Sequence, residues 1–414
     1  MFDIMKGKYY ESDYEEALID LLVQQGWEYT HGGSISRNNR EVLFVDDLML
    51  YLQQRYPDLQ HGDIEEIINR LRHVSGQTHF ELLRNTYYLV RDGFRYIRNQ
   101  DGETFDIEFV DFEAQNKNNI YRCVNQFEVG YGQKNDIRIP DVLLFVNGIP
   151  LCVFELKNPT DFNATIADAY DQIHIRYKRD IPHLLRYAPL SCISDATINN
   201  TKLGTTYTPY NHYYVWKKVN NEDESAKRGT DQVKTIVAGV YEPNRFLEII
   251  RDFVYFPDKK HDKEEEVVCR YPQFFATRML KESVLKAHSA NSSKGGTYFG
   301  ATGCGKTYTM MFLARQLSLR CKELGSPTIV MIVDRDDLQT QAGKLFLRSE
   351  EFLSLGTAKI ISDREDLKRE LSIRESGGFF ICTIQKFCEQ IGELNTRKNI
   401  ICFSDEAHRT QVRL

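Results

Sequence analysis

Hydrophobic spacing in the first part of the chain predicts both helices and strands. Apolar residues recur at helical spacing over Tyr14–Leu22, after a capping box at Ser12–Glu15 and before Gly26, which ends the pattern. Between Thr104 and Val129, apolar and polar residues alternate with a period of two, as in half-buried strands. We therefore expect the chain to open with a mixed α/β domain.

The last part of the chain carries short, continuously apolar runs that are typical of buried parallel strands. Such runs occupy Thr328–Val333, Gly378–Thr383 and Ile400–Phe403. A further strand is expected at Gly295–Phe299, shortly before a segment whose apolar residues have helical spacing. This pattern predicts a parallel α/β lobe.

A charged stretch separates these two patterns. The segment Pro257–Glu266 reads PDKKHDKEEE, with eight charged side chains and no large apolar one. Such a stretch is typical of a solvated link between domains. We therefore predict a first domain over residues 1–250, a charged linker over 251–268 and a second domain over 269–414.

Composition excludes several classes of protein. The 414 residues are 42% hydrophobic and 27% charged, which fits a multidomain globular protein and excludes a disordered chain or a coiled-coil rod. No apolar stretch is long enough for a membrane span, and the acidic N-terminus lacks the apolar core of a signal peptide. The nine cysteines form no C-x-x-C pair, so free thiols in the cytoplasm are expected.

The net charge offers no general attraction to nucleic acid. The chain has 53 lysine and arginine residues and 59 aspartate and glutamate residues, so its formal net charge is −6. Any DNA-binding surface therefore has to be a local cluster of basic residues. One cluster of basic and aromatic residues is a candidate for this DNA-binding surface, and the alternative is that it is only a solvated helix face. It consists of Arg176, Tyr177, Lys178, Arg179, Arg186 and Tyr187.

A glycine-rich motif in the second domain predicts nucleotide binding. The segment Gly300–Thr307 has the pattern G-x-x-x-x-G-K-T. Its glycines allow positive φ, so that successive backbone N–H groups can surround a phosphate at the start of the following helix. Lys306 would reach the β- and γ-phosphates of ATP, and the Thr307 hydroxyl would ligate Mg²⁺. The remaining candidate contacts of this loop are Gly300, Thr302, Gly303 and Gly305.

A second motif, D-E-A-H, begins at Asp405, just after the apolar run Ile400–Phe403. A carboxylate at the end of a parallel strand is where a nucleotide-binding α/β domain holds its Mg²⁺, so Asp405 is the expected ligand. Glu406 is expected to orient and deprotonate the attacking water. The two motifs together predict a lobe that binds ATP and Mg²⁺ but, as half of a motor, hydrolyses ATP very slowly by itself.

Charged residues in the first domain predict a different chemistry. Two apolar runs flank Asn147-Gly148, a hairpin signal, and a turn there would place Asp141 opposite residues 154–156. Glu155 and Lys157 are two residues apart, so both project from one face of their strand. Two carboxylates can hold a divalent cation, and an ammonium group can stabilise charge on a reacting phosphate. This P-D-(x)n-E-x-K pattern predicts a nuclease site, with a solvated pair of side chains as the alternative.

The context of these motifs is similar to that of a known family. The run V-N-G-I-P-L-C-V-F-E-L-K-N-P is followed in order by V-D-R-D-D-L, T-I-Q-K-F and D-E-A-H. From about Tyr14 to its last residue, the chain resembles the restriction (R) subunit of type I restriction-modification enzymes. The resemblance implies a PD-(D/E)xK nuclease domain followed by one RecA-like lobe of a superfamily 2 helicase.

The resemblance also implies an activity and partners. The activity is ATP-dependent translocation and Mg²⁺-dependent cleavage of unmodified double-stranded DNA, and the partners are modification (M) and specificity (S) subunits. Gln273 resembles the adenine-reading glutamine of a Q motif. Residues in the loops after two strands resemble translocase residues that contact DNA phosphates, namely Arg335, Thr383, Gln385 and Lys386.

One feature departs from the family pattern. The family carries Q-x-x-x-Y on a helix after the lysine, whereas the nearest match here, Gln172 and Tyr177, is five residues apart. On a regular α-helix these side chains would diverge by roughly 140°. A π-bulge would bring them back together, so both remain candidates for the nuclease site.

Other readings of the sequence remain open. The chain ends six residues after D-E-A-H, so a second motor lobe with its arginine finger is not expected within it. One alternative is an ATP-binding module that performs no DNA chemistry by itself. Another is a helicase fragment in which Asp141, Glu155 and Lys157 have only a structural role.

Overall fold

A computed structural model of the chain describes most of its length in two compact units. Unit 1 comprises Met1–Val254 and Glu266–Arg270, and unit 2 comprises Tyr255–Glu265 and Tyr271–Leu414. Within these units the described residues are 11–113, 118–133, 136–158, 165–225, 228–258, 264–301, 303–333, 341–354, 356, 358–386 and 394–405.

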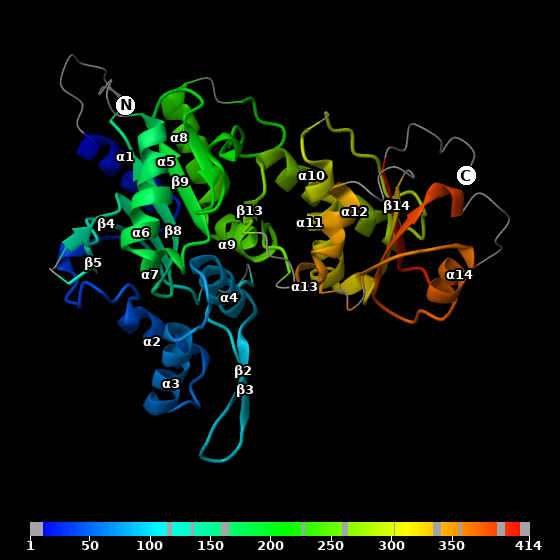
Figure 1. Cartoon of the computed structure of the whole chain (residues 1–414), viewed down its shortest axis with the longest axis horizontal. Coiled ribbons are helices and arrows are strands. Elements are labelled where there is room, and N and C mark those ends of the chain that lie inside the picture. Colours follow the sequence, from blue (N-terminus) through cyan, green and yellow to red (C-terminus); the bar gives the residue numbers. More distant parts are fainter. Residues whose placement is uncertain are drawn as a thin grey trace. The chain divides into compact units, whose positions relative to one another are not determined.

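Unit 1 is built on a mixed sheet with the strand order β1-β4-β7-β8-β9-β10-β11 (Figure 1). Strand β8 lies at its centre, antiparallel to β7 and parallel to β9. All residues of β7 and β8 are buried, which explains their almost unbroken apolar sequence. The strands are β1 (Glu28–His31), β4 (Tyr121–Asn125), β7 (Val142–Val146), β8 (Ile149–Leu156), β9 (Leu190–Ser194), β10 (Thr201–Gly204) and β11 (Tyr214–Val215).

Helices pack on this sheet. Helices α1 and α5 both contact β8, and α8 contacts β10. The helix predicted over Tyr14–Leu22 is confirmed as part of α1. The helices of this layer are α1 (Glu11–Gln24), α5 (Ile166–Asp171), the π-helix η2 (Gln172–Tyr177), α6 (Lys178–Asp180), α7 (Pro182–Leu185), α8 (Gly229–Val240) and α9 (Pro243–Asp252).

A helical subregion and short hairpins complete unit 1. Figure 1 shows α2, α3 and the β2–β3 hairpin gathered on one side of this unit. The alternating segment Thr104–Val129 forms strands only in part, because β3 and β4 are separated by residues outside any strand. These elements are η1 (Gly32–Ser34), α2 (Val45–Arg55), α3 (His61–Arg72), α4 (His79–Asp92), β2 (Phe94–Ile97), β3 (Thr104–Ile107), β5 (Val129–Tyr131), β6 (Asp136–Arg138), η3 (Tyr210–His212) and β13 (Val267–Val268). The two-residue strand β12 (Val254–Tyr255) lies at the boundary between the units.

The turn between β7 and β8 has the predicted hairpin geometry. Asn147 and Gly148 have φ of 51° and 78°, as a type I′ turn requires. A Cβ atom on Gly148 would lie 2.1 Å from the carbonyl oxygen of Phe44, so only glycine fits there. Asn147 is fully buried, and its side chain accepts from the Ile120 N–H and donates to the Phe109 carbonyl. These contacts anchor the turn, and an irregularity between Leu144 and Phe145 then shifts the register of β7 against β8 by one residue.

Unit 2 contains a parallel sheet with the order β15-β16-β14-β17. The three strands predicted from apolar runs are confirmed as β14, β16 and β17. The strands are β14 (Thr328–Val333), β15 (Ala358–Ile360), β16 (Phe379–Thr383) and β17 (Ile400–Ser404). The helical elements are α10 (Tyr271–Ser289), α11 (Lys306–Leu319), η4 (Lys322–Leu324), α12 (Gln341–Leu347), α13 (Glu350–Leu353), α14 (Arg364–Ser372) and η5 (Ile384–Lys386).

Two expectations about the chain are wrong. Gly295–Phe299 forms no strand, since adjacent glycines offer no side chains to pack and Phe299 is 95% exposed. The charged stretch is not solvated throughout, because Asp258 and Glu266 near its ends are buried. The Asp258 carboxylate accepts hydrogen bonds from the N–H groups of Glu350 and Glu351 at the start of α13. A helix N-terminus therefore explains why this acidic residue is buried.

Candidate functional site

The β7–β8 hairpin brings Asp141 to the strand that carries Glu155. Val142 pairs with Phe154 after the register shift between Leu144 and Phe145, which places Asp141 beside residues 155 and 156, within the predicted range 154–156. The Asp141 Oδ2 atom accepts a hydrogen bond of 2.5 Å from the Leu156 N–H. The backbone of β8 therefore holds this carboxylate at the end of the hairpin.

Glu155 is the centre of a hydrogen-bonded cluster. Its side chain is 0% exposed, although it carries a carboxyl group. Lys157 Nζ donates to Glu155 Oε1 at 2.8 Å, and the Tyr177 hydroxyl donates to Oε2 at 2.9 Å. Both oxygens of the buried carboxyl group thus have a partner, as burial in a low-dielectric interior requires.

A π-helix brings Gln172 and Tyr177 together. The segment between them is η2, in which the wider turn offsets the extra residue in their spacing. Gln172 Nε2 donates to the Tyr177 hydroxyl at 2.9 Å. The divergence expected on a regular α-helix does not occur, and the π-bulge that would prevent it is present. Gln172 therefore reaches Glu155 through one intervening hydroxyl.

Burial controls the protonation of this cluster. Desolvation, followed by the neighbouring Asp141 carboxylate, raises the pKa of Glu155 well above its ordinary value. Desolvation and the charge of Glu155 likewise raise the pKa of the Tyr177 hydroxyl. Lys157 acts in the opposite direction on Glu155 because its ammonium favours the carboxylate. Because the Asp141 carboxylate disfavours ionisation of Glu155, the pair favours a bound proton or a cation.

This arrangement has the donor set of a site for a hard divalent cation. Mg²⁺ binds proteins through one or two carboxylates and keeps several of its waters. Asp141 and Glu155 supply two such groups, and their mutual repulsion is the electrostatic strain that a cation relieves. No cluster of three or more acidic, histidine or cysteine ligands occurs in the described residues, so water or backbone oxygen would complete the coordination.

The sequence did not single out a second group that anchors the π-helix. His174 stacks on Tyr170 with ring centroids 3.9 Å apart, and its Nε2 atom lies 3.0 Å from the Tyr213 hydroxyl. Burial lowers the pKa of His174 to about 3, so the imidazole is neutral. The i, i+4 spacing of Tyr170 and His174 is the sequence signal that could have indicated this contact.

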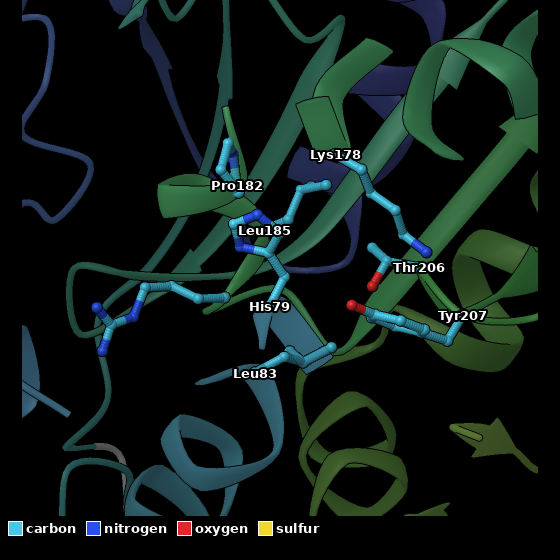
Figure 2. Close-up of a pocket in the computed structure, with 8 residues that line it drawn as sticks. His79, Leu83, Lys178, Pro182, Leu185, Thr206 and Tyr207 are labelled. Carbon is cyan, nitrogen blue, oxygen red and sulfur yellow. The ribbon is translucent and has the colours of Figure 1, made fainter. Parts of the chain in front are cut away.

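The basic side chains of the predicted cluster have different contacts. Arg179 pairs with Asp180 at 2.7 Å, whereas Arg186 donates to the carbonyl oxygens of Arg72 and Val74. Lys178 lies over the ring of Tyr207, with 3.6 Å from Nζ to the ring centroid. Tyr187 is buried, and Arg176 is exposed. Lys178 and Arg186 nevertheless line one pocket (Figure 2), and a role of the cluster in DNA binding stays a prediction.

In unit 2 the glycine-rich loop meets the helix as predicted. Gly305 caps α11 with φ of 83°, and Gly303 also has positive φ, at 80°. Lys306 is the first residue of α11, and its Nζ donates to the Gly300 carbonyl at 3.3 Å. Thr307 follows within the helix, while Thr302 lies outside the described residues.

Gln273 supports this loop from α10. Its side-chain amide donates to the carbonyl oxygens of Cys304 and Gly305 at 3.4 and 3.3 Å. A Cβ atom on Gly305 would lie 2.3 Å from Gln273 Nε2, so this contact needs a glycine. Gln273 is 4% exposed. A role of Gln273 in reading adenine stays a prediction.

The other candidates in unit 2 lie near the carboxyl ends of parallel strands. Asp405 directly follows β17, and its N–H donates to the Ile332 carbonyl at 2.9 Å. Thr383 ends β16 and is buried, whereas Gln385 is exposed. Lys386 donates to the Ile361 carbonyl. Arg335 and Glu406 lie outside the described residues.

Membrane insertion and disulfide bonds have no support in the described residues. No helix there combines the length and apolar character needed to cross a bilayer. The cysteines in that part of the chain are free, and most are buried.

Comparisons with known proteins agree with these two units. Residues 8–212 match the family "Type I restriction enzyme R protein N terminus", and residues 272–413 match the SWI2/SNF2 ATPase family. The HindI endonuclease subunit of Haemophilus influenzae is 33% identical, with 97% of this chain and 39% of that relative covered. The putative MjaIXP endonuclease subunit of Methanocaldococcus jannaschii is 28% identical, with 96% of this chain and 39% of that relative covered. The chain thus spans about two fifths of these curated relatives, and it belongs to the family of type I restriction enzyme endonuclease subunits.

Proposed function

We propose that unit 1 is a PD-(D/E)xK nuclease domain that cleaves double-stranded DNA with Mg²⁺. The observation that carries this proposal is the buried Glu155 carboxyl group, held by Lys157 and Tyr177 and strained by the nearby Asp141. A buried carboxyl group beside the half-buried Asp141 carboxylate is costly for stability, which favours a functional role for it. The alternative of a solvated strand pair loses support because Glu155 is fully buried.

Each side chain has a distinct task in the proposed site. Asp141 and Glu155 would hold Mg²⁺, which supplies positive charge against the charge that develops on the scissile phosphate. Lys157 is positioned by its bond to Glu155 and would stabilise the same charge or orient a water molecule. Tyr177, itself held by Gln172, orients Glu155 through Oε2. Tyr177 and Gln172 are therefore positioning residues.

We further propose that unit 2 is a RecA-like lobe that binds ATP and Mg²⁺. The positive φ of Gly303 and Gly305 and the position of Lys306 at the start of α11 support this. Asp405 at the end of β17 would hold Mg²⁺, and Glu406 would activate water. The match of residues 272–413 to SWI2/SNF2 ATPases favours ATP as the nucleotide.

In this proposal the chain acts as the R subunit, or part of it, in a complex with modification and specificity subunits in the cytoplasm. The relatives' names support an endonuclease complex, and the net charge of −6 favours partners that supply DNA recognition. ATP-driven translocation along unmodified DNA would then bring the nuclease to its substrate. Arg335, Thr383, Gln385 and Lys386 would contact the DNA backbone.

Two variants test the nuclease assignment in the assembled enzyme. Asp141→Asn and Glu155→Gln should each abolish DNA cleavage, because each removes a metal-binding charge. ATP hydrolysis by the same preparations should stay within about twofold of wild type, since that chemistry belongs to unit 2. Glu16→Gln, on the exposed face of α1, is the matched control. Normal cleavage by both variants would favour the ATP-binding module or helicase fragment.

A further inference from the structure

An ion pair connects the two segments of unit 1 that carry Asp141 and Tyr177. Arg138 Nε donates to Asp180 Oδ2 at 2.8 Å, and Arg138 Nη2 lies 2.6 Å from the same oxygen. Arg138 precedes Asp141 by three residues, and Asp180 follows Tyr177 by three residues. Each partner of the ion pair is therefore close along the chain to one residue of the candidate nuclease site.

The segment that leads into Asp141 belongs to no sheet. Strand β6 ends at Arg138 and pairs with β5 in a two-stranded sheet, whereas β7 begins at Val142 in the seven-stranded sheet. Residues 139–141 connect these strands and are not part of either. The hydrogen-bond ladder of a sheet therefore does not hold Asp141 from its amino-terminal side. Because Pro140 restricts the backbone of this segment, a contact made by Arg138 also constrains the residue that follows Pro140.

A second contact joins the same two segments. The Tyr177 hydroxyl lies 3.3 Å from the Ile139 carbonyl oxygen, in addition to its hydrogen bond with Glu155. Tyr177 and Asp180 are about one helical turn apart. The segment before Asp141 is thus held at two points against one turn of the helical segment that also orients Glu155.

The ion pair itself has a well-defined geometry. The side chain of Asp180 is 6% exposed, and it also accepts a hydrogen bond of 2.7 Å from Arg179. Hydrogen bonds from Arg179 and Arg138 lower the pKa of Asp180 to about 2, so its carboxylate is charged at neutral pH. The Arg138 guanidinium lies over the ring of Tyr131 in β5, 4.8 Å from the centroid. Arg138 is 31% exposed and Arg179 66%, so the pair with Arg138 is the better shielded of the two.

We propose that Arg138 and Asp180 are positioning residues that set the place of the Asp141 carboxylate relative to Glu155. This inference rests on the nuclease function proposed above. The ion pair holds the start of the segment 138–141, and the Leu156 N–H holds the Asp141 carboxylate at its other end. Two carboxylates bind one cation only when their separation suits it, so a displaced Asp141 binds a divalent cation less tightly. Arg138 and Asp180 act on the cation only through Asp141.

Titration calorimetry of the full chain with Mn²⁺, without nucleotide or DNA, tests the proposal through Arg138→Gln. Removing a positive charge near a cation site favours cation binding by electrostatics alone, whereas loss of positioning weakens it. We expect Arg138→Gln to weaken Mn²⁺ binding roughly tenfold, the loss typical of groups that orient a metal ligand. Asp180→Asn should weaken it to a similar degree. The double variant should be no worse than either single variant, because both substitutions break the same contact.

Arg179→Gln is the matched control, because it removes the other guanidinium from the same carboxylate. It should bind Mn²⁺ within about twofold of wild type, since its pair is more exposed to solvent. Thermal unfolding verifies that each variant is folded, and Asp180→Asn decides the matter if Arg138→Gln does not fold. Wild-type Mn²⁺ binding by the folded variants, with binding weakened by Asp141→Asn, overturns this inference alone. Mn²⁺ binding that Asp141→Asn leaves unchanged overturns the proposed nuclease site and this inference with it.

Discussion

At the scale of single residues, the site depends on one carboxyl group in an unfavourable place. Glu155 is fully buried and its pKa is raised. The neighbouring Asp141 carboxylate raises this pKa further, whereas the Lys157 ammonium group lowers it. The sequence predicted which residues meet, because strand alternation and an Asn-Gly turn set the register to within one residue. It could not predict the irregularity between Leu144 and Phe145 that shifts the register by one. It could not predict burial of Glu155, since a two-residue spacing is the same on exposed and buried strands.

The pKa of Glu155 predicts a pH-dependent loss of stability. The folded state binds the proton of the Glu155 carboxyl group more tightly than the unfolded state does. This proton binding therefore stabilises the fold fully below the ordinary pKa of Glu, and the stabilisation is lost as the pH rises through the raised pKa. Each unit by which the pKa is raised corresponds to about 1.4 kcal/mol. Glu155→Gln cannot ionise and should therefore unfold at a higher temperature than wild type at about pH 8 in EDTA.

The comparison needs a control and a second pH. The advantage of Glu155→Gln should shrink toward about pH 5, where the wild-type group retains its proton. Glu16→Gln, at an exposed position of α1, should show no such advantage at either pH. An equal or lower unfolding temperature for Glu155→Gln at both pH values would contradict the raised pKa.

At the scale of secondary structure, the π-helix η2 decides whether the site assembles. Gln172 and Tyr177 are five apart, and helical periodicity alone predicts that they diverge. The π-turn corrects this, and the contacts of His174 with Tyr170 and Tyr213 help to anchor it. Such a turn depends on tertiary packing and so could be named from the sequence only as one option.

Deleting Ile175 tests this interpretation of η2. The residue is 57% exposed, and its removal leaves Gln172 and Tyr177 separated by three residues, one turn apart on a regular α-helix. We expect the variant to fold, with its unfolding temperature close to wild type, and to cleave DNA in the assembled enzyme. Deleting Ala238 from α8 should instead rotate buried side chains by about 100° and destabilise by several kcal/mol. An equal loss of stability in the two deletion variants would contradict this interpretation of η2.

The scale of elements also explains where sequence reasoning failed. Strands β14, β16 and β17 were predictable because their apolar runs are buried within a parallel sheet. Gly295–Phe299 has a similar apolar content at its end, yet Phe299 is exposed and no described strand pairs with the segment. Local composition does not reveal whether a pairing partner exists.

At the scale of the whole molecule, the candidate residues for the two proposed chemistries lie in different units. The candidate nuclease residues Asp141, Glu155 and Lys157 lie in unit 1, and the glycine-rich loop with Lys306 lies in unit 2. The sequence located both sets through short motifs, whereas the burial of Asp258 and Glu266 in the charged stretch needed the three-dimensional structure.

Lys306→Ala tests the separation of the two chemistries. The substitution removes the ammonium group at the start of α11 and should weaken ATP binding at least about tenfold in calorimetry. The effect of Glu155→Gln on unfolding should be the same with and without Lys306→Ala, because the two residues lie in separate units and independent sites are additive within about 0.5 kcal/mol. Undiminished ATP binding by Lys306→Ala would argue against the assignment of the loop.

The central claim is that Asp141 and Glu155 together hold a divalent cation, and titration calorimetry with Mn²⁺ tests it most directly. Mn²⁺ prefers the same oxygen ligands as Mg²⁺, and nucleotide is left out so that unit 2 contributes little. At about pH 8 the account predicts one site that Asp141→Asn and Glu155→Gln each weaken at least about tenfold and that Lys306→Ala leaves unchanged. Mn²⁺ binding that survives both carboxylate substitutions would contradict it.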